Sequence, residues 1–298
     1  MATNSNIEWT DATWNPVTGC TRVSAGCDHC YAVKMTHRLE SMGVEKYGGL
    51  TVLNNRGQRH FSGKVVCHDD ALVIPLQWRK QRRVFVNSMS DLLHRDVPFE
   101  FIDRVFAVMA LCQQHTFQVL TKRPERMAEY LNADDVQHRI ARAIDAIEVQ
   151  RDIVALQERW KPLSGVWLGT SAENQATANE RIPNLRDCPA AVRFVSYEPA
   201  LEAVLFGVPK SAIDWIIVGG ESGPGARPFH CEWAESTIAS CRAQEIACFV
   251  KQLGSNPFRN GRPLLLKHPK GGDLNEWPKH LRVREWPAGL CLRLTDEA

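Results

Sequence analysis

Three cysteines lie close together near the start of the chain, and their spacing indicates metal chemistry. Cys20, Cys27 and Cys30 fall within eleven residues in the pattern C-x6-C-x2-C, and a glycine precedes each of the first two. Glycine allows the tight backbone turns that let several thiols converge on one point. Thiolates are ligands of zinc and of iron–sulfur clusters, so the grouped cysteines predict one of these two sites.

The number of grouped cysteines favours an iron–sulfur cluster over zinc. A structural zinc site takes four ligands, and the chain has no second C-x2-C pair, which leaves His29 or His37 as the nearest fourth ligand. A 4Fe–4S cluster held by three thiolates keeps one iron open for a substrate or cofactor. Zinc, or a purely structural role, stays open as an alternative. The other seven cysteines stand singly and are expected to be small buried side chains.

The composition is that of a folded globular protein. The 298 residues are 44% hydrophobic and 23% charged, which excludes general disorder. No apolar run approaches the roughly 18 residues that span a bilayer, and the polar start carries no signal-peptide pattern. We therefore expect a cytoplasmic protein that makes no membrane contact and keeps its ten cysteines reduced. The formal net charge of +2 neither favours nor excludes a nucleic-acid partner.

Short apolar runs alternate with helical patterns along most of the chain. Strands followed by helices are typical of parallel β-α-β units, and six to eight of them in about 250 residues predict an α/β fold with a TIM-like (β/α) barrel, full or partial. A doubly wound open sheet is the alternative, although no G-x-G-x-x-G follows an early strand. Helical patterns cover 99–112 and 232–244. The predicted strands are Thr13–Val17, Val84–Asn87, Phe117–Thr121, Val166–Thr170, Val192–Ser196, Trp215–Val218 and Cys248–Lys251, with a weaker one at Lys64–His68.

Two regions depart from this alternation within what we expect to be a single domain over residues 1–298. Residues 131–163 carry a long helical pattern, with apolar positions that include Val136 and Ile140, and we predict a helical insertion there. The tail over 252–298 is rich in Gly, Pro and Trp. Its aromatic residues predict an ordered, irregular C-terminal wrap rather than disorder.

Polar and charged residues follow nearly every predicted strand. The chemistry of β/α barrels gathers at the carboxyl ends of the strands, so these residues are candidates for an active site. Of the charged ones, we expect Lys122, Glu198 and Glu221 to act in catalysis. Four glycines between Gly219 and Gly225 would let the backbone approach a phosphate or carboxylate closely. The other candidates at strand ends are Ser88, Ser90, Asp91, Ser171, Glu173 and Asn174.

The cysteine loop and the predicted barrel together resemble the radical S-adenosylmethionine (SAM) superfamily and, more closely, the phage Gp37/Gp68 family. The resemblance covers about residues 7–290 and rests on the motifs WNPVTGC and SAGCDHCYA around the cysteines, VNSMSDL (86–92), LTKRP (120–124) and VGGESG (218–223). It implies a barrel that holds a 4Fe–4S cluster on Cys20, Cys27 and Cys30. SAM would bind the fourth iron through its amino and carboxylate groups.

By this resemblance, the residues after the second barrel strand bind the SAM amino group. Superfamily members carry a Gly-Gly-Glu segment there, and this chain has Ser88, Ser90 and Asp91 instead. The segment 219–221 reads Gly-Gly-Glu but lies far too late in the chain to be that element. The cysteine spacing also departs from the usual C-x3-C-x-aromatic-C loop, because the first interval here is six residues long.

The resemblance assigns the ribose and the adenine of SAM to two further groups. Ser171, Glu173 and Asn174 are placed for the ribose hydroxyls. The position before the last cysteine of the loop, which is aromatic in the superfamily, holds His29, and Tyr31 follows the same cysteine. Either ring is expected to stack on the adenine.

The implied reaction is the reductive cleavage of SAM to a 5′-deoxyadenosyl radical, which abstracts hydrogen from a substrate. An external electron donor of the flavodoxin or ferredoxin type is implied as a partner. We expect a nucleic-acid substrate, DNA in particular, and either base modification or repair of a DNA photoproduct. Basic side chains placed to meet a phosphate backbone are Arg56, Arg59, Lys122, Arg123, Arg126, Arg227 and the run Trp78–Arg83.

Two other functions stay open at this point. The first is a zinc-stabilised nucleic-acid-binding protein without redox chemistry, with His29 or His37 as the fourth ligand. The second is an iron–sulfur protein that binds SAM without radical chemistry. Metal content separates the first from a cluster enzyme, and formation of 5′-deoxyadenosine separates the second.

Overall fold

The chain divides into two compact units, Met1–Arg193 and Phe194–Ala298. The computed structural model describes residues 3–5, 7–147, 162–207 and 212–287. The expectation of a single domain over the whole chain stays a prediction.

The first unit is built on parallel strands with buried side chains. The pairing order is β2 (Ala12–Trp14), β7 (Arg83–Val86), β8 (Thr116–Thr121) and β9 (Val166–Ser171), and β1 (Thr3–Asn4) pairs antiparallel with β2. Every residue of β9 is buried, as expected for a strand of a parallel sheet that is covered on both faces. Four predicted strands are thereby confirmed, although the first of them ends early.

The first predicted strand ends early because Pro16 interrupts it. Proline has no N–H to donate to a sheet. The chain therefore leaves the main sheet after Trp14 and forms β3 (Val17–Thr18), which pairs antiparallel with β6 (Val66–Cys67). The weaker strand predicted at Lys64–His68 exists, but it belongs to this separate two-stranded sheet and not to the barrel.

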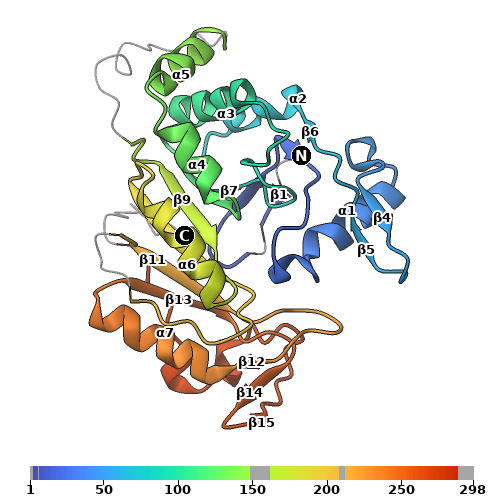
Figure 1. Ribbon diagram of the computed structural model, residues 1–298, viewed down its shortest axis with the longest axis vertical. Helices are drawn as coiled ribbons and strands as arrows, with labels where there is room; N and C mark the ends of the chain where they lie inside the picture. The colour runs from blue at the N-terminus through green and yellow to red at the C-terminus, as the bar shows by residue number, and fades with distance from the viewer. Residues whose placement is uncertain (1–2, 6, 148–161, 208–211, 288–298) are drawn as a thin grey trace. The chain divides into compact units, whose positions relative to one another are not determined.

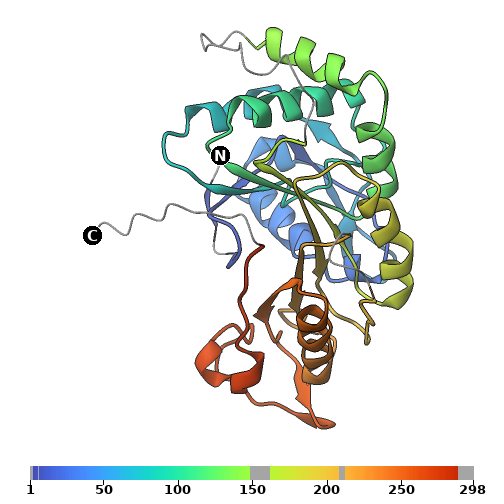
Figure 2. The same ribbon diagram turned by 90° about the vertical axis from the view of Figure 1, so that its left-hand side faces the viewer.

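The described residues of the first unit also form six helices and one hairpin. The helices are α1 (Tyr31–Ser41), α2 (Asp69–Leu72), α3 (Phe99–Leu111), α4 (Pro124–Leu131), α5 (Val136–Asp145) and α6 (Gln175–Arg186). Helix α3 packs against α5 and α4 against α6, and α3, α4 and α6 line the same side of the strands (Figures 1 and 2). The hairpin, which the sequence does not predict, pairs β4 (Thr51–Leu53) with β5 (Arg59–Phe61).

The predicted helical insertion at 131–163 contains α5 in its described part. Val136, Ile140 and Ile144 are buried on one face of α5, at the spacing that predicts the helix. Ile147 is half-buried just after α5, and residues 148–161, which include Ile153 and Leu156 of the predicted pattern, lie outside the described residues.

The second unit has parallel strands of the same kind. β10 (Val192–Tyr197), β11 (Trp215–Gly219) and β13 (Ala247–Gln252) pair in parallel. Helix α7 (Cys231–Ala243) packs against β11 and β13. Three predicted strands and the helix predicted at 232–244 are thereby confirmed.

The predicted C-terminal wrap is irregular in its described part, which ends at residue 287. Its strands β14 (Pro257–Arg259) and β15 (Arg262–Pro263) form a small sheet with β12 (Phe229–His230). Trp286 stacks on Trp215 of β11 with ring centroids 5.0 Å apart, and such aromatic contacts hold an irregular segment in place. Two 3-10 turns lie at Leu274–Glu276 and Lys279–Leu281.

The strand order decides between the two predicted architectures. Seven parallel strands follow one another in chain order across the main sheet, as β2-β7-β8-β9-β10-β11-β13, with β1 at the edge. Strands follow chain order in a β/α barrel, whereas a doubly wound sheet reverses its order at a switch point. With helices flanking the strands, this order confirms an α/β fold of the partial TIM-like barrel type. The doubly wound alternative is wrong.

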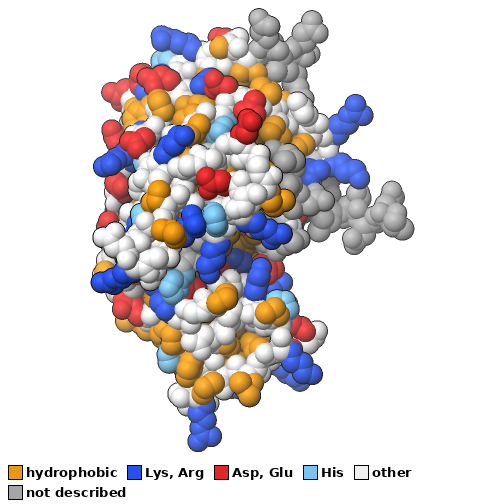
Figure 3. All heavy atoms as spheres, turned by 90° about the vertical axis from the view of Figure 1, so that its right-hand side faces the viewer, with side chains coloured by type: hydrophobic (Ala, Val, Ile, Leu, Met, Phe, Trp, Pro, Cys, Tyr) orange, Lys and Arg blue, Asp and Glu red, His pale blue; other side chains and the backbone are white. Residues whose placement is uncertain are grey.

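Side chains of mixed character cover the face of the molecule shown in Figure 3. Lys and Arg are interspersed there with acidic, histidine and hydrophobic side chains, in keeping with the small net charge of +2. Across the described ranges, no helix combines the length and the apolar character that crossing a membrane requires.

Candidate functional site

The three clustered cysteines occupy one loop of the first unit, between β3 and α1. Cys20 follows β3, Cys27 ends a 3-10 turn that begins at Ala25, and Cys30 caps the N-terminus of α1. All three thiols are free and half-buried. A charge on Cys30 raises the pKa of Cys20, and a charge on Cys27 raises the pKa of Cys30, so Cys30 lies within electrostatic reach of both other thiols.

Burial and two nearby cations shift the pKa values of two of these thiols in opposite directions. Burial, and then the charge of Asp91, raise the pKa of Cys20 to about 12 against the charge and the hydrogen bond of Arg123. Burial also raises the pKa of Cys30, and the charge of Lys122 opposes that rise. The cations beside the loop therefore favour the thiolate forms that metal binding requires.

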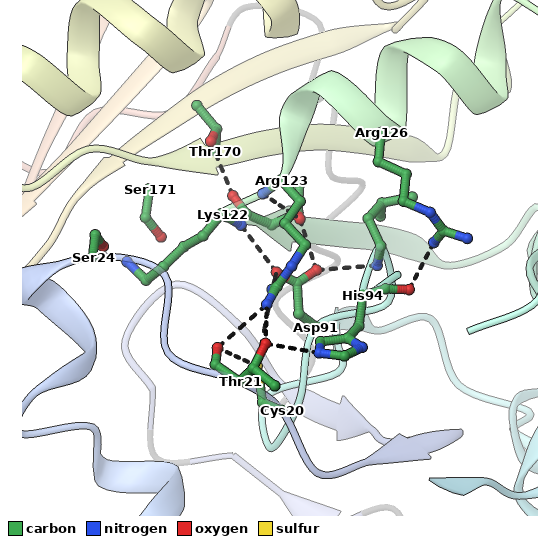
Figure 4. Close-up of polar contacts among 12 residues, drawn as sticks. Cys20, Thr21, Ser24, Asp91, His94, Lys122, Arg123, Arg126, Thr170 and Ser171 are labelled. Carbon is green, nitrogen blue, oxygen red and sulfur yellow. Dashed lines mark hydrogen bonds and ion pairs between the residues drawn. The ribbon is translucent and has the colours of Figure 1, made fainter. Parts of the chain in front are cut away.

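Arg123 joins the cysteine loop to the end of β8 (Figure 4). Its Nη1 lies 4.0 Å from Sγ of Cys20 and 2.7 Å from Oδ2 of Asp91. Its Nη2 donates to the carbonyl oxygen of Thr21 and, at 2.8 Å, to the hydroxyl of the same residue. Asp91 accepts in addition from the hydroxyl of Thr121 and from two backbone N–H groups, so both of its oxygens are occupied. The guanidinium is thus held rigidly beside the first cysteine.

A neutral histidine supports the same network. His94 is fully buried, and burial lowers its pKa, with the charge of Arg123 acting in the same direction. Its Nδ1 accepts from the backbone N–H of Asp96, which leaves the Nε2 proton for the hydroxyl of Thr21, 2.8 Å away. The Thr21 hydroxyl therefore accepts from both Arg123 and His94, and this fixes the residue next to the first cysteine.

A second network of buried ion pairs holds the middle of the loop. Glu173, which follows β9, is fully buried between Lys122 and Arg181, and Nη1 of Arg181 lies 3.2 Å from its Oε2. Ser24 donates to Oε1 of Glu173 at 2.8 Å. Burial raises the pKa of Glu173, but the charges of the two cations and the hydrogen bonds from Lys122 and Ser24 outweigh burial, so the pKa lies below its ordinary value. Glu173 is therefore a carboxylate in the folded protein.

Gly26 is required where the loop passes this carboxylate. A Cβ on Gly26 would lie 2.4 Å from Oε1 of Glu173, closer than side-chain atoms approach one another. The glycine before Cys27 therefore does more than turn the backbone, because it lets the loop come against a charged group from β9.

We expect Gly19→Ala to destabilise the protein more than Gly57→Ala does. Both glycines have a left-handed backbone, with φ of +84° and +71°, where alanine costs roughly 1–2 kcal/mol. The new Cβ at residue 19 would also lie 2.0 Å from the carbonyl oxygen of Lys64, whereas residue 57 has open space around it. Urea titration should show a loss of about 3 kcal/mol for Gly19→Ala and about half of that for Gly57→Ala. Equal losses would contradict this packing.

The residues predicted for the SAM amino group lie together after β7. The hydroxyl of Ser90 donates to the carbonyl of Val17 at 2.8 Å, and that of Ser88 donates to the amide oxygen of Asn15 at 3.2 Å. These bonds tie the segment to the start of the cysteine loop, and Asp91 is held in the ion pair described above. Each of the three side chains thus has a partner within the protein, and their contact with SAM stays a prediction.

The residues predicted for the ribose lie at the end of β9 and directly after it, and they also have partners. Glu173 is taken up by its ion pairs, and Asn174 caps α6 by accepting a backbone N–H of the first turn at 2.9 Å. The carbonyl of Ser171 accepts from Arg181 at 2.8 Å, and Figure 4 shows the Ser171 side chain near the amine of Lys122. The contact of this segment with ribose stays a prediction.

The two rings predicted for the adenine flank the last cysteine of the loop. Tyr31 is 52% exposed, and its hydroxyl donates to the carbonyl of Ser88. His29 is exposed as well. Tyr31 therefore connects the first turn of α1 to the segment after β7.

The two glutamates predicted as catalytic lie in the second unit, and each forms an ion pair. Oε1 of Glu198 lies 2.6 Å from the amine of Lys251. Glu221 accepts from Nε and Nη2 of Arg227 at 3.1 and 2.5 Å. That pair spans the Gly-rich loop 219–225 and fixes its conformation. Catalysis stays a prediction for both glutamates and for Lys122, which lies in the first unit.

Most of the basic side chains singled out for phosphate contact have partners within the protein. Arg83 pairs with Asp11 at 2.7 Å, and Arg126 donates to two backbone carbonyls, in addition to the ion pairs described above. A phosphate backbone would therefore meet fewer basic groups than the sequence predicts. The exposed members of that set are Arg56, Arg79 and Lys80.

The single cysteines are buried, largely as expected. Cys67, in β6, is half-buried, and Cys291 lies outside the described residues. The fully buried ones are Cys112, Cys188, Cys231, Cys241 and Cys248.

Several residues that position the loop have no site role in the sequence predictions. Arg123 is predicted only as a phosphate contact, yet its place directly after a strand, next to Lys122, is a usable signal. Thr21 and Ser24 lie between the first two cysteines, where any polar residue is a candidate for holding the loop in place. Arg181 gives no signal, because an arginine in a polar helix is normally exposed.

The thiols of the loop are ligands that an iron–sulfur cluster or zinc can take, and the choice between the two stays a prediction. Three free thiols are the soft ligands that both metals take. Among the residues that the structure describes, no three His, Cys, Asp or Glu side chains, the loop cysteines included, are placed to hold a single metal ion. The histidines offered as a fourth zinc ligand are turned to other surroundings, since His29 is exposed and His37 lies 3.9 Å from Glu40. The loop therefore supplies three thiols, which is the number that a cluster with an open iron needs.

Comparison with known proteins gives one family and one group of solved structures. A family model described as "Protein of unknown function (DUF5131)" matches residues 4–279. No curated protein matches the chain. A spore photoproduct lyase complexed with dinucleoside spore photoproduct is 10% identical, with a TM-score of 0.41, over 83% of this chain and 65% of that chain. A mutant lyase with bound AdoMet and dinucleoside spore photoproduct is 11% identical, with a TM-score of 0.40, over 74% and 58%. The chain thus spans less than two thirds of these lyases, and similarity at this level transfers no activity.

Proposed function

Because the chain belongs to the DUF5131 family, whose function is unknown, we propose a function from its own side chains: it is a radical SAM-type iron–sulfur enzyme. Cys20, Cys27 and Cys30 hold the cluster in this proposal. When bound, the cluster supplies the electron that cleaves SAM into methionine and a 5′-deoxyadenosyl radical, and a flavodoxin- or ferredoxin-type donor replaces that electron. The finer resemblance to the phage Gp37/Gp68 family stays a prediction.

One observation carries this proposal: buried ion pairs fix the cysteine loop at two points. Arg123, paired with Asp91, holds Thr21 beside the first cysteine. Glu173 holds Ser24 between the first and the second cysteine. Charged groups are costly to bury, and a loop that only connects two elements has no need of them. Thiols held in place in advance lose less freedom when a cluster binds.

The SAM molecule is assigned to the segments that follow β7 and β9. The amino group is assigned to Ser88–Asp91 and the ribose to Ser171–Asn174, since the carboxyl ends of parallel strands face one edge of a sheet. The adenine is assigned to Tyr31, which is exposed in the first turn after the last cysteine, with His29 as the second choice. Lys122 is held by Glu173 at this edge and is the acid–base candidate of the first unit.

Anaerobic purification of the full chain tests the cluster. We expect a brown protein with absorbance near 400 nm and about four irons per chain. With dithionite and SAM, chromatography should detect 5′-deoxyadenosine. A colourless protein with one zinc would overturn the proposal in favour of a zinc-stabilised protein. Iron without 5′-deoxyadenosine, both with and without DNA, would leave a SAM-binding iron–sulfur protein that carries out no radical chemistry.

The proposed substrate is a nucleic acid, and the observation that favours it is the tip of the β4–β5 hairpin. Arg56 is exposed there beside a depression of about 490 Å³, which is also lined by amide side chains and His60. Such groups meet phosphates and base edges. None of the lining residues belongs to the cysteine loop.

Salt dependence tests the nucleic-acid substrate. Binding of a DNA oligonucleotide should weaken steeply with salt, and Arg56→Ala should lower the slope by about one phosphate contact. Arg186→Ala is the matched control, because Arg186 is an exposed arginine on α6 that pairs with Asp187. Binding that is insensitive to salt, or equal slopes for the two variants, would remove this part of the proposal.

A further inference from the structure

Arg123 places a buried positive charge against one of the three thiols. Its Nη1 lies 4.0 Å from Sγ of Cys20, and the arginine side chain is only 11% exposed. Asp91, which is 7% exposed, lies 2.7 Å from the same nitrogen. A cation and an anion therefore stand in contact with each other beside the first cysteine.

We propose that the Arg123–Asp91 pair sets the reduction potential of the cluster on the cysteine loop, with Arg123 favouring the reduced state and Asp91 the oxidised state. The inference rests on the proposed function, since it needs a cluster bound through Cys20. It goes beyond that function by giving two side chains opposite and measurable effects.

The physical reason is the charge that reduction adds. One electron makes a cluster one unit more negative, so a nearby cation stabilises the reduced state and a nearby anion opposes it. Net charge, hydrogen bonds to sulfur and solvent exposure are the terms by which a protein tunes such a cluster. Charges act more strongly in a site from which water is largely excluded.

The hydrogen bonds of Arg123 hold its charge at a fixed position beside Cys20. Asp91 and Thr21 accept from its two terminal nitrogens, and His94 holds the same Thr21 hydroxyl from the other side. The planar guanidinium can make these contacts and still direct an N–H toward Cys20, which a lysine ammonium on a flexible stem cannot do.

Redox titration with dithionite, without SAM and followed by electron paramagnetic resonance, tests the inference on the full iron-loaded chain. For Arg123→Met we expect the equilibrium constant for one-electron reduction to fall about tenfold, which lowers the potential by about 59 mV. For Asp91→Asn we expect a rise of about the same size. Arg126→Met is the matched control. Arg126 is three residues further on, donates to two backbone carbonyls and lies over the ring of Phe99, so the constant should change by less than about twofold.

The inference would be overturned if the reduction potentials of Arg123→Met and Asp91→Asn shifted in the same direction. It would also be overturned if both potentials stayed unchanged while the iron content was intact. Either result would leave the proposed function standing. A wild-type protein without iron would overturn both. Should Arg123→Met fail to take up a cluster, Asp91→Asn still decides by the sign of its shift. Arg123→Lys keeps the positive charge but loses the two-pronged guanidinium. Its reduction potential should then lie between that of wild type and the value expected for Arg123→Met.

Discussion

Cys20→Ala, Cys27→Ala and Cys30→Ala should each lower the iron content from about four atoms per chain to less than one. The three thiolates are the complete protein ligand set in the proposal, so each variant leaves only two. Iron analysis and absorbance near 400 nm after anaerobic reconstitution measure the loss. Each variant keeps the loop's backbone contacts and its ion pairs, so urea unfolding of the iron-free variants should stay close to that of iron-free wild type.

Cys67→Ala is the matched control for these three variants. Cys67 is also free and half-buried, and it lies in β6, which pairs with β3 just before the loop. It should keep its iron. Iron retained by any of the three loop variants would show that its thiol is not a ligand. Iron lost from Cys67→Ala as well would show that the assay reports folding.

The second large effect is expected from Glu173→Gln, with a loss of about 3 kcal/mol in the free energy of unfolding. The substitution keeps the shape but removes the charge that compensates Arg181, which is 2% exposed. A buried cation without its partner is among the costliest defects in a protein. Urea titration measures the loss, and Glu180→Gln, an exposed change on α6, the helix that carries Arg181, should stay within about 0.5 kcal/mol of wild type.

The pH dependence of this pair has a defined sign. The pKa of Glu173 lies below its ordinary value of 4.5 in the folded protein, since the cations and hydrogen bonds around it outweigh burial. The unfolded chain therefore takes up the proton first as pH falls. The stabilisation is complete above pH 4.5 and is lost as pH falls through the lower folded value. The difference in the free energy of unfolding between wild type and Glu173→Gln should narrow in that acid range. A difference that stays constant with pH would contradict the ion pair.

The barrel strands were predictable because they are buried on both faces. β11 reads as a continuous apolar run and β9 begins as one, which is the pattern of a covered parallel strand. The β4–β5 hairpin was not predictable, because its strands are short and partly exposed and carry no clear alternation. The strand at Val66–Cys67 was visible as a pattern, but its partner was not, since pairing with β3 depends on where Pro16 turns the chain.

The candidate site was predictable only in part. The residues that hold the cysteine loop in place could not be predicted. The three cysteines and the polar residues at strand ends are visible as types and spacings. Asp91 holds Arg123, which contacts the loop, and Glu173 accepts directly from Ser24 of the loop; these contacts span 32 and 149 residues of chain. No local pattern encodes such contacts. A carboxylate that binds an arginine reads the same in sequence as one that awaits a ligand.

The distance along the chain between Ser24 and Glu173 also sets an order of events during synthesis. The carboxylate that holds the middle of the cysteine loop is made 149 residues after the serine that it binds. At 5–20 residues per second, that interval is roughly 7–30 s. During this time the chain already contains Asp91 and Arg123, which hold the start of the loop, but it lacks the carboxylate that holds the middle of the loop. In the proposed function, uptake of a cluster by a fully restrained loop therefore follows the pairing of β9 with the sheet.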